Sequence, residues 1–382
     1  MNIRKLAVWI TFLAIFAMGA RISMDTDTWW HLRAGQWIIE HHQPLRVDEF
    51  SYTRAGAPWE YPGWLVEVPM YLIYHVFGPG GLNLWTAALV TLAYVFVWST
   101  LEGGTFLRAF VIVLAATASG VYWAARPYLV TFLCAAVFLW ILESYRWQKP
   151  RYPKWLIWLM PLLMVLWANS HGGFIIGFIL WGVYWISEAG SKAWDTWVGQ
   201  KTPFMLRNWS TPLFWSGILM LISVCVNPYG PVMLLYPIRT VEIGALRNYI
   251  QEWQSPDFHS LSVQPFAWLF LLTFAAVGAS RRRLAFIDFV LVAGFAYMGL
   301  LAGRNIALFS IVAPMVLTRH AAPVLSAVGR RFSVKAEHLS PRNKALSTLN
   351  LFILIFLTLA VIAKIAMVYP TAVNEKAFRA AD

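Results

Sequence analysis

Residues 6–32 read LAVWITFLAIFAMGARISMDTDTWWHL, an apolar run that leads into an acidic and aromatic motif. Arg4 and Lys5 precede the run. A bilayer core takes about 20 consecutive, mostly apolar residues per helix, and more such runs follow along the chain. We therefore expect an uncleaved first transmembrane helix in place of a cleaved signal peptide. In either case, the motif Asp25–Leu32 lies outside the cytoplasm.

The composition is that of a membrane protein. Of its 382 residues, 59% are hydrophobic and only 13% are charged, about half the charged share of a soluble domain. The 22 Trp residues suit side chains that anchor at lipid headgroups. The net charge of +12 comes from short loops between apolar runs, which argues against nucleic acid as a partner. Cys134 and Cys225 lie inside apolar runs and form no metal or disulfide spacing.

The apolar runs predict an all-α polytopic membrane protein with about 11 transmembrane helices. The expected spans are residues 5–21, 82–101, 106–124, 128–144, 155–169, 173–188, 209–226, 263–279, 285–301, 305–319 and 347–368. Charge bias supports this count, because it places 19 of the 30 basic residues in cytoplasmic loops and 12 of the 18 acidic residues outside.

The segment from Trp64 to Phe77 is not counted as a transmembrane span, and this choice decides the topology. It is too short to span, and it has a polar stripe that includes Glu67 and an apolar stripe that includes Leu72. This pattern is typical of a helix in the interface plane. If the segment spanned, every later basic loop would move outside.

The predicted organisation has three parts. Residues 1–320 form the transmembrane domain, in which 22–81 is a long first extracytoplasmic loop carrying two amphipathic helices. Residues 321–346 form a basic cytoplasmic loop, and 347–382 form the last transmembrane helix and an extracytoplasmic tail. The N-terminus is then cytoplasmic and the C-terminus extracytoplasmic.

Asp25 and Asp27 are the candidate catalytic residues. One carboxylate at the membrane boundary can accept a proton as general base, while the other orients an acceptor. Asp25, Asp27 and His31 also have the oxygen and nitrogen atoms that hold a divalent metal ion, which is therefore a possible cofactor. The local alternative is that Asp27 caps a helix running to about His41.

Further polar residues fall on the predicted outer side as candidate substrate-binding groups. Trp29 and Trp30 suit a sugar or lipid-phosphate platform, or a membrane anchor, and the guanidinium groups of Arg126 and Arg304 suit a lipid phosphate or snorkelling to headgroups. The complete set is Trp29, Trp30, His31, Asp48, Glu60, Arg126, Asn169, His171 and Arg304. Within it, Asp48 and Glu60 would form a second acidic pair, and Asn169 and His171 would face the outer cavity; ordinary loop charges and a helical hairpin are the plainer alternatives.

These features resemble the GT-C class of membrane glycosyltransferases, and more narrowly the bacterial relatives of protein mannosyltransferases and lipid A aminoarabinose transferases. One span, an acidic motif at Asp25 and Asp27, and a long outer loop with a second helix at Trp64–Phe77 carry the resemblance. It covers most of the chain, to about residue 320, and is closest to uncharacterised bacterial members. Many members add a terminal soluble domain, which this sequence lacks.

The resemblance implies a protein of the bacterial inner membrane and cell envelope. It would move a sugar from a polyprenyl-phosphate carrier to an acceptor on the extracytoplasmic face, with Asp25 as catalytic acid or base and Asp27 as its companion. Its partners would be a lipid-linked sugar and membrane lipid. Two other functions fit the same sequence: a transporter or flippase of a lipid-linked glycan, and a non-catalytic membrane assembly protein.

Overall fold

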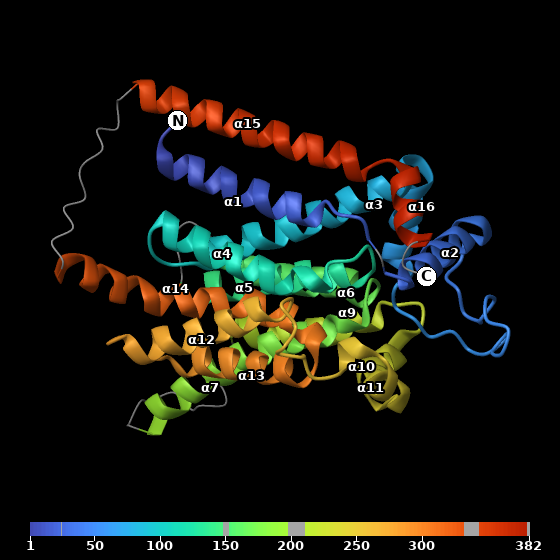
Figure 1. Cartoon of the computed structure of the whole chain (residues 1–382). Coiled ribbons are helices and arrows are strands. Elements are labelled where there is room, and N and C mark those ends of the chain that lie inside the picture. The colour runs from blue at the N-terminus through green and yellow to red at the C-terminus, as the bar shows by residue number, and fades with distance from the viewer. Residues whose placement is uncertain (24, 148–152, 198–210, 332–343, 380–382) are drawn as a thin grey trace. The chain divides into compact units, whose positions relative to one another are not determined.

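The computed structural model describes residues 1–23, 25–147, 153–197, 211–331 and 344–379 (Figure 1). Within those residues the secondary structure is helical, apart from an isolated bridge between Val47 and Pro58. The chain divides into two compact units. Unit 1 comprises Met1–Met24, Asn83–Trp123 and Gln251–Asp382, and unit 2 comprises Asp25–Leu82 and Ala124–Ile250.

Unit 1 is built around one buried helix, α14. It packs against α4, α12 and α13, and α1 packs against α4 and α15 (Figure 1). Apolar side chains along α14, among them Ala307, Phe309 and Met315, are fully buried. The helices of unit 1 are α1 (Ile3–Gly19), the second part of α3 (Trp64–Thr100), α4 (Thr105–Ser119), η1 (Gly120–Tyr122), η5 (Gln251–Trp253), α12 (Gln264–Ala279), α13 (Phe286–Leu301), η6 (Gly303–Asn305), α14 (Ile306–Arg331), α15 (Lys344–Val368) and α16 (Thr371–Arg379).

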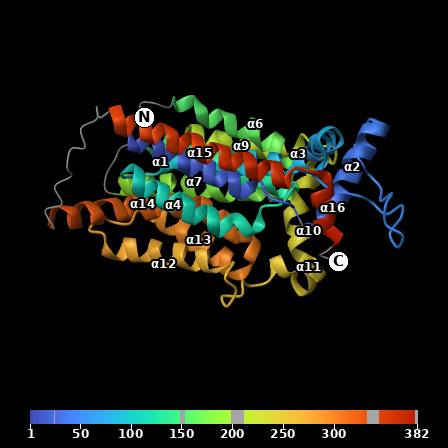
Figure 2. The same cartoon turned by 45° about the horizontal axis from the view of Figure 1, so that its top comes forward.

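Unit 2 holds the helices that frame the first loop. In it α6 packs against α9 and α5, and α7 packs against α5 and α9 (Figure 2). Its helices are α2 (Asp27–His41), the first part of α3, α5 (Tyr128–Trp147), η2 (Lys154–Trp158), α6 (Leu159–Ala168), η3 (Gly172–Phe174), α7 (Ile175–Trp197), α9 (Pro212–Cys225), η4 (Gly230–Leu235), α10 (Tyr236–Glu242) and α11 (Gly244–Tyr249).

Helix ends follow local chemistry. Asn2 caps α1 by accepting a hydrogen bond from the Lys5 amide at 2.8 Å. Thr211 caps α9, whose first residue is Pro212, a position where the missing N–H costs nothing. Gly78 interrupts α3 with φ 64° and ψ −166°, a conformation that glycine adopts at little cost. The Trp64–Phe77 helix therefore continues into the following apolar helix across a break at Gly78.

The described helices support a membrane protein. Six are long and apolar enough to cross a bilayer, and the number rises to seven if the pair Pro212–Cys225 and Gly230–Glu242, bent by 113°, is one span. Helices also occupy the other expected spans, but Lys154–Ala168, Gln264–Ala279 and Phe286–Leu301 are shorter than 18 residues. The count of 11 stays a prediction.

The predicted cytoplasmic loop at 321–346 is partly helical, since α14 continues to Arg331 and α15 begins at Lys344. Beyond the apolar run, α14 extends as a more polar helix as far as Arg331. Residues 332–343, the first two residues of the expected span 209–226 and the last three residues of the chain lie outside the described part.

Candidate functional site

Arg126 joins the two candidate catalytic carboxylates in unit 2. Its Nη1 atom lies 3.2 Å from Asp25 Oδ2 and 3.4 Å from Asp27 Oδ2. The Asp25 and Arg126 side chains are 18% and 15% exposed, whereas the Asp27 side chain is 52% exposed. The Trp30 indole N–H also donates to Asp27 Oδ1 at 3.3 Å. The ion pairs are thus partly buried, and the Asp27 carboxylate remains open to solvent.

The start of α2 explains this placement. The helix begins at Asp27, and the Asp27 amide donates to Asp25 Oδ1 at 3.0 Å. The alternative in which Asp27 caps the helix is therefore wrong: Thr26 holds the cap position without a side-chain cap bond, and Asp27 is the first helical residue. The Thr28 hydroxyl donates to the Ala125 carbonyl at 3.0 Å and so holds α2 beside the segment that carries Arg126.

His31 lies one turn further along α2 and is 3% exposed. Its Nδ1 atom is 2.8 Å from Glu67 Oε1, and the Glu67 side chain is 2% exposed. Burial lowers the pKa of His31 well below its ordinary value, and the positive charge of Arg126 acts in the same direction. We conclude that His31 is neutral at pH 7 and shares one hydrogen bond with Glu67.

Glu67 and Tyr61 are residues of this site that sequence reasoning missed. Glu67 was placed on the polar stripe of an interfacial helix, without a partner. The sequence pattern carried no signal for this, because Glu67 is buried although His75 of the same stripe is exposed and Leu72 of the apolar stripe is 47% exposed. Burial, followed by the negative charge of Glu67, raises the pKa of the Tyr61 phenol. Tyr61 therefore stays a protonated, neutral hydroxyl.

The aromatic pair at the start of α2 has two different environments. Trp30 packs edge-on against Trp59 and Tyr61, with ring centroids 5.8 Å and 5.1 Å apart. Trp29 is 42% exposed and makes an edge contact with Tyr74 at 6.0 Å. Trp30 thus belongs to the site's framework, while Trp29 presents an exposed ring that suits a lipid or sugar contact.

His171 has a defined tautomer. Its Nδ1 atom accepts a hydrogen bond from the Gly173 amide at 2.9 Å, so Nδ1 carries no proton. The Thr131 hydroxyl lies 2.8 Å from the same atom and itself accepts from the Trp167 indole at 2.9 Å. The neutral His171 ring therefore carries its proton on Nε2.

The Asn169 side chain is buried and hydrogen-bonded within the protein, in contrast to the cavity-facing position that the sequence predicts. It is 4% exposed, accepts from the Trp64 indole at 2.9 Å, and donates to the carbonyls of Val165 and Val226 at 2.8 Å and 2.7 Å. These bonds tie the first turn of α3 to the ends of α6 and α9. The Asn169 side-chain amide therefore has a structural role.

Asp48 and Glu60 do not form the expected acidic pair. Asp48 is buried in its own turn, where hydrogen bonds from the Ser51 hydroxyl and from the amides of Ser51 and Phe50 lower its pKa. Glu60 pairs instead with Arg239 at 3.2 Å, in an exposed contact. A short loop satisfies its own carboxylate through such turns, which removes Asp48 from the site.

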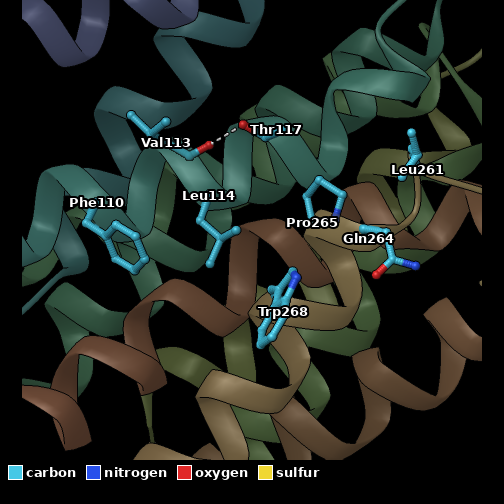
Figure 3. Close-up of a pocket in the computed structure, with 8 residues that line it drawn as sticks. All are labelled: Phe110, Val113, Leu114, Thr117, Leu261, Gln264, Pro265 and Trp268. Carbon is cyan, nitrogen blue, oxygen red and sulfur yellow. Dashed lines mark hydrogen bonds between the residues drawn. The ribbon is translucent and has the colours of Figure 1, made fainter.

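Arg304 belongs to unit 1. Its Nη1 atom lies 3.5 Å from Glu252 Oε1, and its guanidinium stacks over the Trp253 ring at 4.5 Å. Unit 1 also has an apolar pocket of about 330 Å³ between α4 and the start of α12 (Figure 3). None of the predicted site residues lines it; its lining is Phe110, Val113, Leu114, Thr117, Leu261, Gln264, Pro265 and Trp268.

Metal binding by Asp25, Asp27 and His31 finds no support in the geometry. Within the described parts of the chain, no three His, Cys, Asp or Glu side chains are grouped to hold an ion. Arg126 neutralises the two carboxylates, and His31 Nδ1 is taken by Glu67. Metal binding here stays a prediction, and we derive no chemical step through a metal ion.

Comparison with known proteins gives no family. No protein-family model matches the chain, and no curated protein matches it. The function must be argued from the site itself.

Proposed function

We propose that this chain is a GT-C-type membrane glycosyltransferase that moves a sugar from a polyprenyl-phosphate donor to an acceptor on the extracytoplasmic face. The observation that carries the proposal is the contact of one guanidinium with two carboxylates, Asp25 and Asp27, directly after an apolar N-terminal helix. A guanidinium is the side chain best suited to a phosphate, and a carboxylate is suited to take a proton from a hydroxyl.

The proposal includes a topology of 11 spans. It places 22–81 outside, with α2 and the first part of α3 as the two amphipathic helices of that loop. The exposed apolar side chains Leu72, Val76 and Phe77 support an interfacial position for the latter helix, because they have no protein to cover them and suit lipid.

In the proposed reaction, the donor phosphate replaces a carboxylate as the partner of Arg126. A donor phosphate competes with Asp25 and Asp27 for the guanidinium, because phosphate and carboxylate are both anions whose oxygens accept charge-assisted hydrogen bonds from it. A carboxylate released from Arg126 then accepts the proton of the acceptor hydroxyl, while the acceptor oxygen bonds to the anomeric carbon. The bond from that carbon to the phosphate oxygen breaks, and Arg126 stabilises the polyprenyl phosphate that leaves.

The two carboxylates have distinct proposed roles. Asp25 is the base, as the resemblance implies, and Asp27, the more exposed of the two, holds the acceptor hydroxyl. Both groups can be removed without a change of size by substitution with Asn. The surrounding contacts of α2 are then kept.

The test measures release of polyprenyl phosphate from a panel of polyprenyl-phosphate hexoses by the purified protein in lipid nanodiscs, with a heat-inactivated cell-envelope extract as the source of the acceptor hydroxyl. Asp25→Asn and Asp27→Asn should each lower turnover by about 100-fold or more. Glu40→Gln is the matched control, since Glu40 is exposed on α2 in the same loop, and it should stay within about twofold. Undiminished turnover in both Asn variants would remove their assigned roles, and no turnover of any donor by the unchanged protein would remove the function.

A second function, transport of a lipid-linked glycan, is favoured by one observation. The pair Pro212–Cys225 and Gly230–Glu242 bends by 113°, and broken helices are common in transporters. Liposomes that carry a fluorescent polyprenyl-phosphate sugar in one leaflet separate the two proposals. Movement of intact donor between leaflets supports transport, and cleavage of the donor supports transfer.

A further inference from the structure

The backbone of Glu67 packs directly against Gly35 of α2. A Cβ atom on Gly35 would lie 2.2 Å from the Glu67 carbonyl oxygen, so only glycine permits this contact between α2 and α3. The approach brings the Glu67 carboxylate 2.8 Å from His31 Nδ1. A carboxylate and an imidazole buried to 2–3% exposure hold each other in one orientation, because any other orientation leaves a buried polar group unpaired.

A second set of contacts leads from His31 to the candidate catalytic pair. The Trp30 ring lies against the His31 ring with centroids 3.5 Å apart, and the Trp30 N–H donates to Asp27 Oδ1. Asp27, Trp30 and His31 are at positions i, i+3 and i+4 of α2 and so share one face of the helix. Arg126 holds the other oxygen of the Asp27 carboxylate.

We propose that Glu67 is a positioning residue: through His31 and Trp30 it fixes the Asp27 carboxylate in the orientation that receives the acceptor hydroxyl. The role in sugar transfer rests on the proposed function, whereas the placement of Asp27 does not. Without Glu67, the His31 ring loses its partner, the Trp30 ring loses its support, and the Trp30 N–H no longer points steadily at Asp27.

The test has a readout that needs no sugar transfer. A water-soluble carbodiimide modifies accessible carboxyl groups, and mass spectrometry of the peptide that contains Asp27 gives its labelling rate at pH 6. Loss of one hydrogen bond to the carboxylate should raise that rate about fivefold. Glu67→Ala breaks the contact with His31, and Trp30→Phe keeps the stacked ring but removes the N–H donor.

Both single variants should therefore label Asp27 faster, and the double variant should label no faster than either one, because the two changes break one series of contacts. Glu67→Gln retains a hydrogen-bonding side chain of the same size and should restore a rate close to that of the unchanged protein. It also reports on Glu67 if the Ala variant fails to fold. Glu40→Ala, on the exposed face of α2, is the matched control.

In the transfer assay, Glu67→Ala and Trp30→Phe should lower kcat and leave the KM for the polyprenyl-phosphate donor within about twofold, since neither residue contacts the proposed phosphate-binding guanidinium. An unchanged Asp27 labelling rate in Trp30→Phe, or independent, multiplying effects in the double variant, would overturn the inference. If the labelling rates change as expected but the unchanged protein transfers no sugar, the placement of Asp27 stands and the proposed function falls.

Discussion

Gly35 meets the peptide backbone of Glu67 with no room for a methyl group, since a Cβ atom would lie 2.2 Å from the carbonyl oxygen and 2.7 Å from the carbonyl carbon. The neighbour is backbone, which cannot rotate away as a flexible side chain can. The position of α2 relative to the start of α3, and with it the contact between His31 and Glu67, therefore depends on this glycine.

Gly35→Ala should destabilise the protein by about 1–3 kcal/mol, the usual cost of overpacking a tight contact. The measurement is the midpoint of thermal unfolding in nanodiscs. Gly182→Ala is the control, because a Cβ atom at Gly182 of α7 would meet nothing within 4 Å. A Gly35→Ala midpoint equal to that of the control would contradict the close approach.

His31 should make stability depend on pH. Its pKa is lower in the folded protein than the ordinary value of 6.5, so the unfolded chain binds a proton that the folded chain does not. The stabilising contribution is complete above about pH 6.5 and is lost as the pH falls below it. Burial also raises the pKa of Glu67, which acts in the opposite direction, so Glu67→Gln serves as the background. In that background, the loss of thermal stability between pH 7.5 and pH 5 should be smaller with His31→Gln than without it.

The control for this measurement is His259→Gln in the same background, since His259 is exposed in unit 1. Its pH dependence should match that of Glu67→Gln alone. An identical acid loss in all three proteins would show that His31 does not titrate differently in the folded and unfolded states.

Arg126→Gln should lower kcat/KM for the polyprenyl-phosphate donor by about 100-fold, the cost of removing one donor that stabilises a developing charge. Arg126→Lys keeps the charge but loses the planar guanidinium, whose Nη1 atom contacts both Asp25 and Asp27, and it should restore only part of the activity. Arg46→Gln removes an exposed guanidinium that donates to the Pro228 carbonyl, and it serves as the control. Full activity in Arg126→Gln would exclude the phosphate role.

Arg319 and Asp288 form a buried ion pair in unit 1, at 2.6 Å and 2% exposure on each side. Arg319 also contacts Glu102 at 3.1 Å, so Asp288→Asn removes the more buried of its two carboxylate partners and should cost up to about 3–5 kcal/mol. Arg239→Gln breaks an exposed pair with Glu60 at 3.2 Å and should cost less than about 1 kcal/mol. Thermal unfolding midpoints compare the two, and equal shifts would argue against a buried pair.

The proposed topology predicts opposite labelling of two exposed positions. Tyr52, which is fully exposed, lies in the first loop, and Ser326 lies in the cytoplasmic extension of α14. In a Cys225→Ser background, Tyr52→Cys should react with a membrane-impermeant maleimide in intact cells, and Ser326→Cys only after permeabilisation. The reverse pattern would place the site in the cytoplasm and end the glycosyltransferase proposal.

Much of the secondary structure could be predicted because it depends on local sequence. A backbone in lipid must satisfy its own hydrogen bonds, so a long apolar run forms a helix wherever the chain later places it. Runs of hydropathy therefore located α5 and α15 within a few residues. The same reasoning identified Asp25 and Asp27 as carboxylates just beyond a membrane helix.

The partners of those carboxylates could not be predicted, since each comes from a distant part of the chain. Asp25 meets Arg126 only because α2 packs beside the segment before α5, and His31 meets Glu67 only because Gly35 lets two helices touch. Hydropathy and charge along the sequence thus determined a helical membrane protein with acids beyond its first apolar helix. Tertiary packing alone decided which polar groups pair with one another, because pairing depends on distances of a few ångströms between helices that the sequence order does not fix.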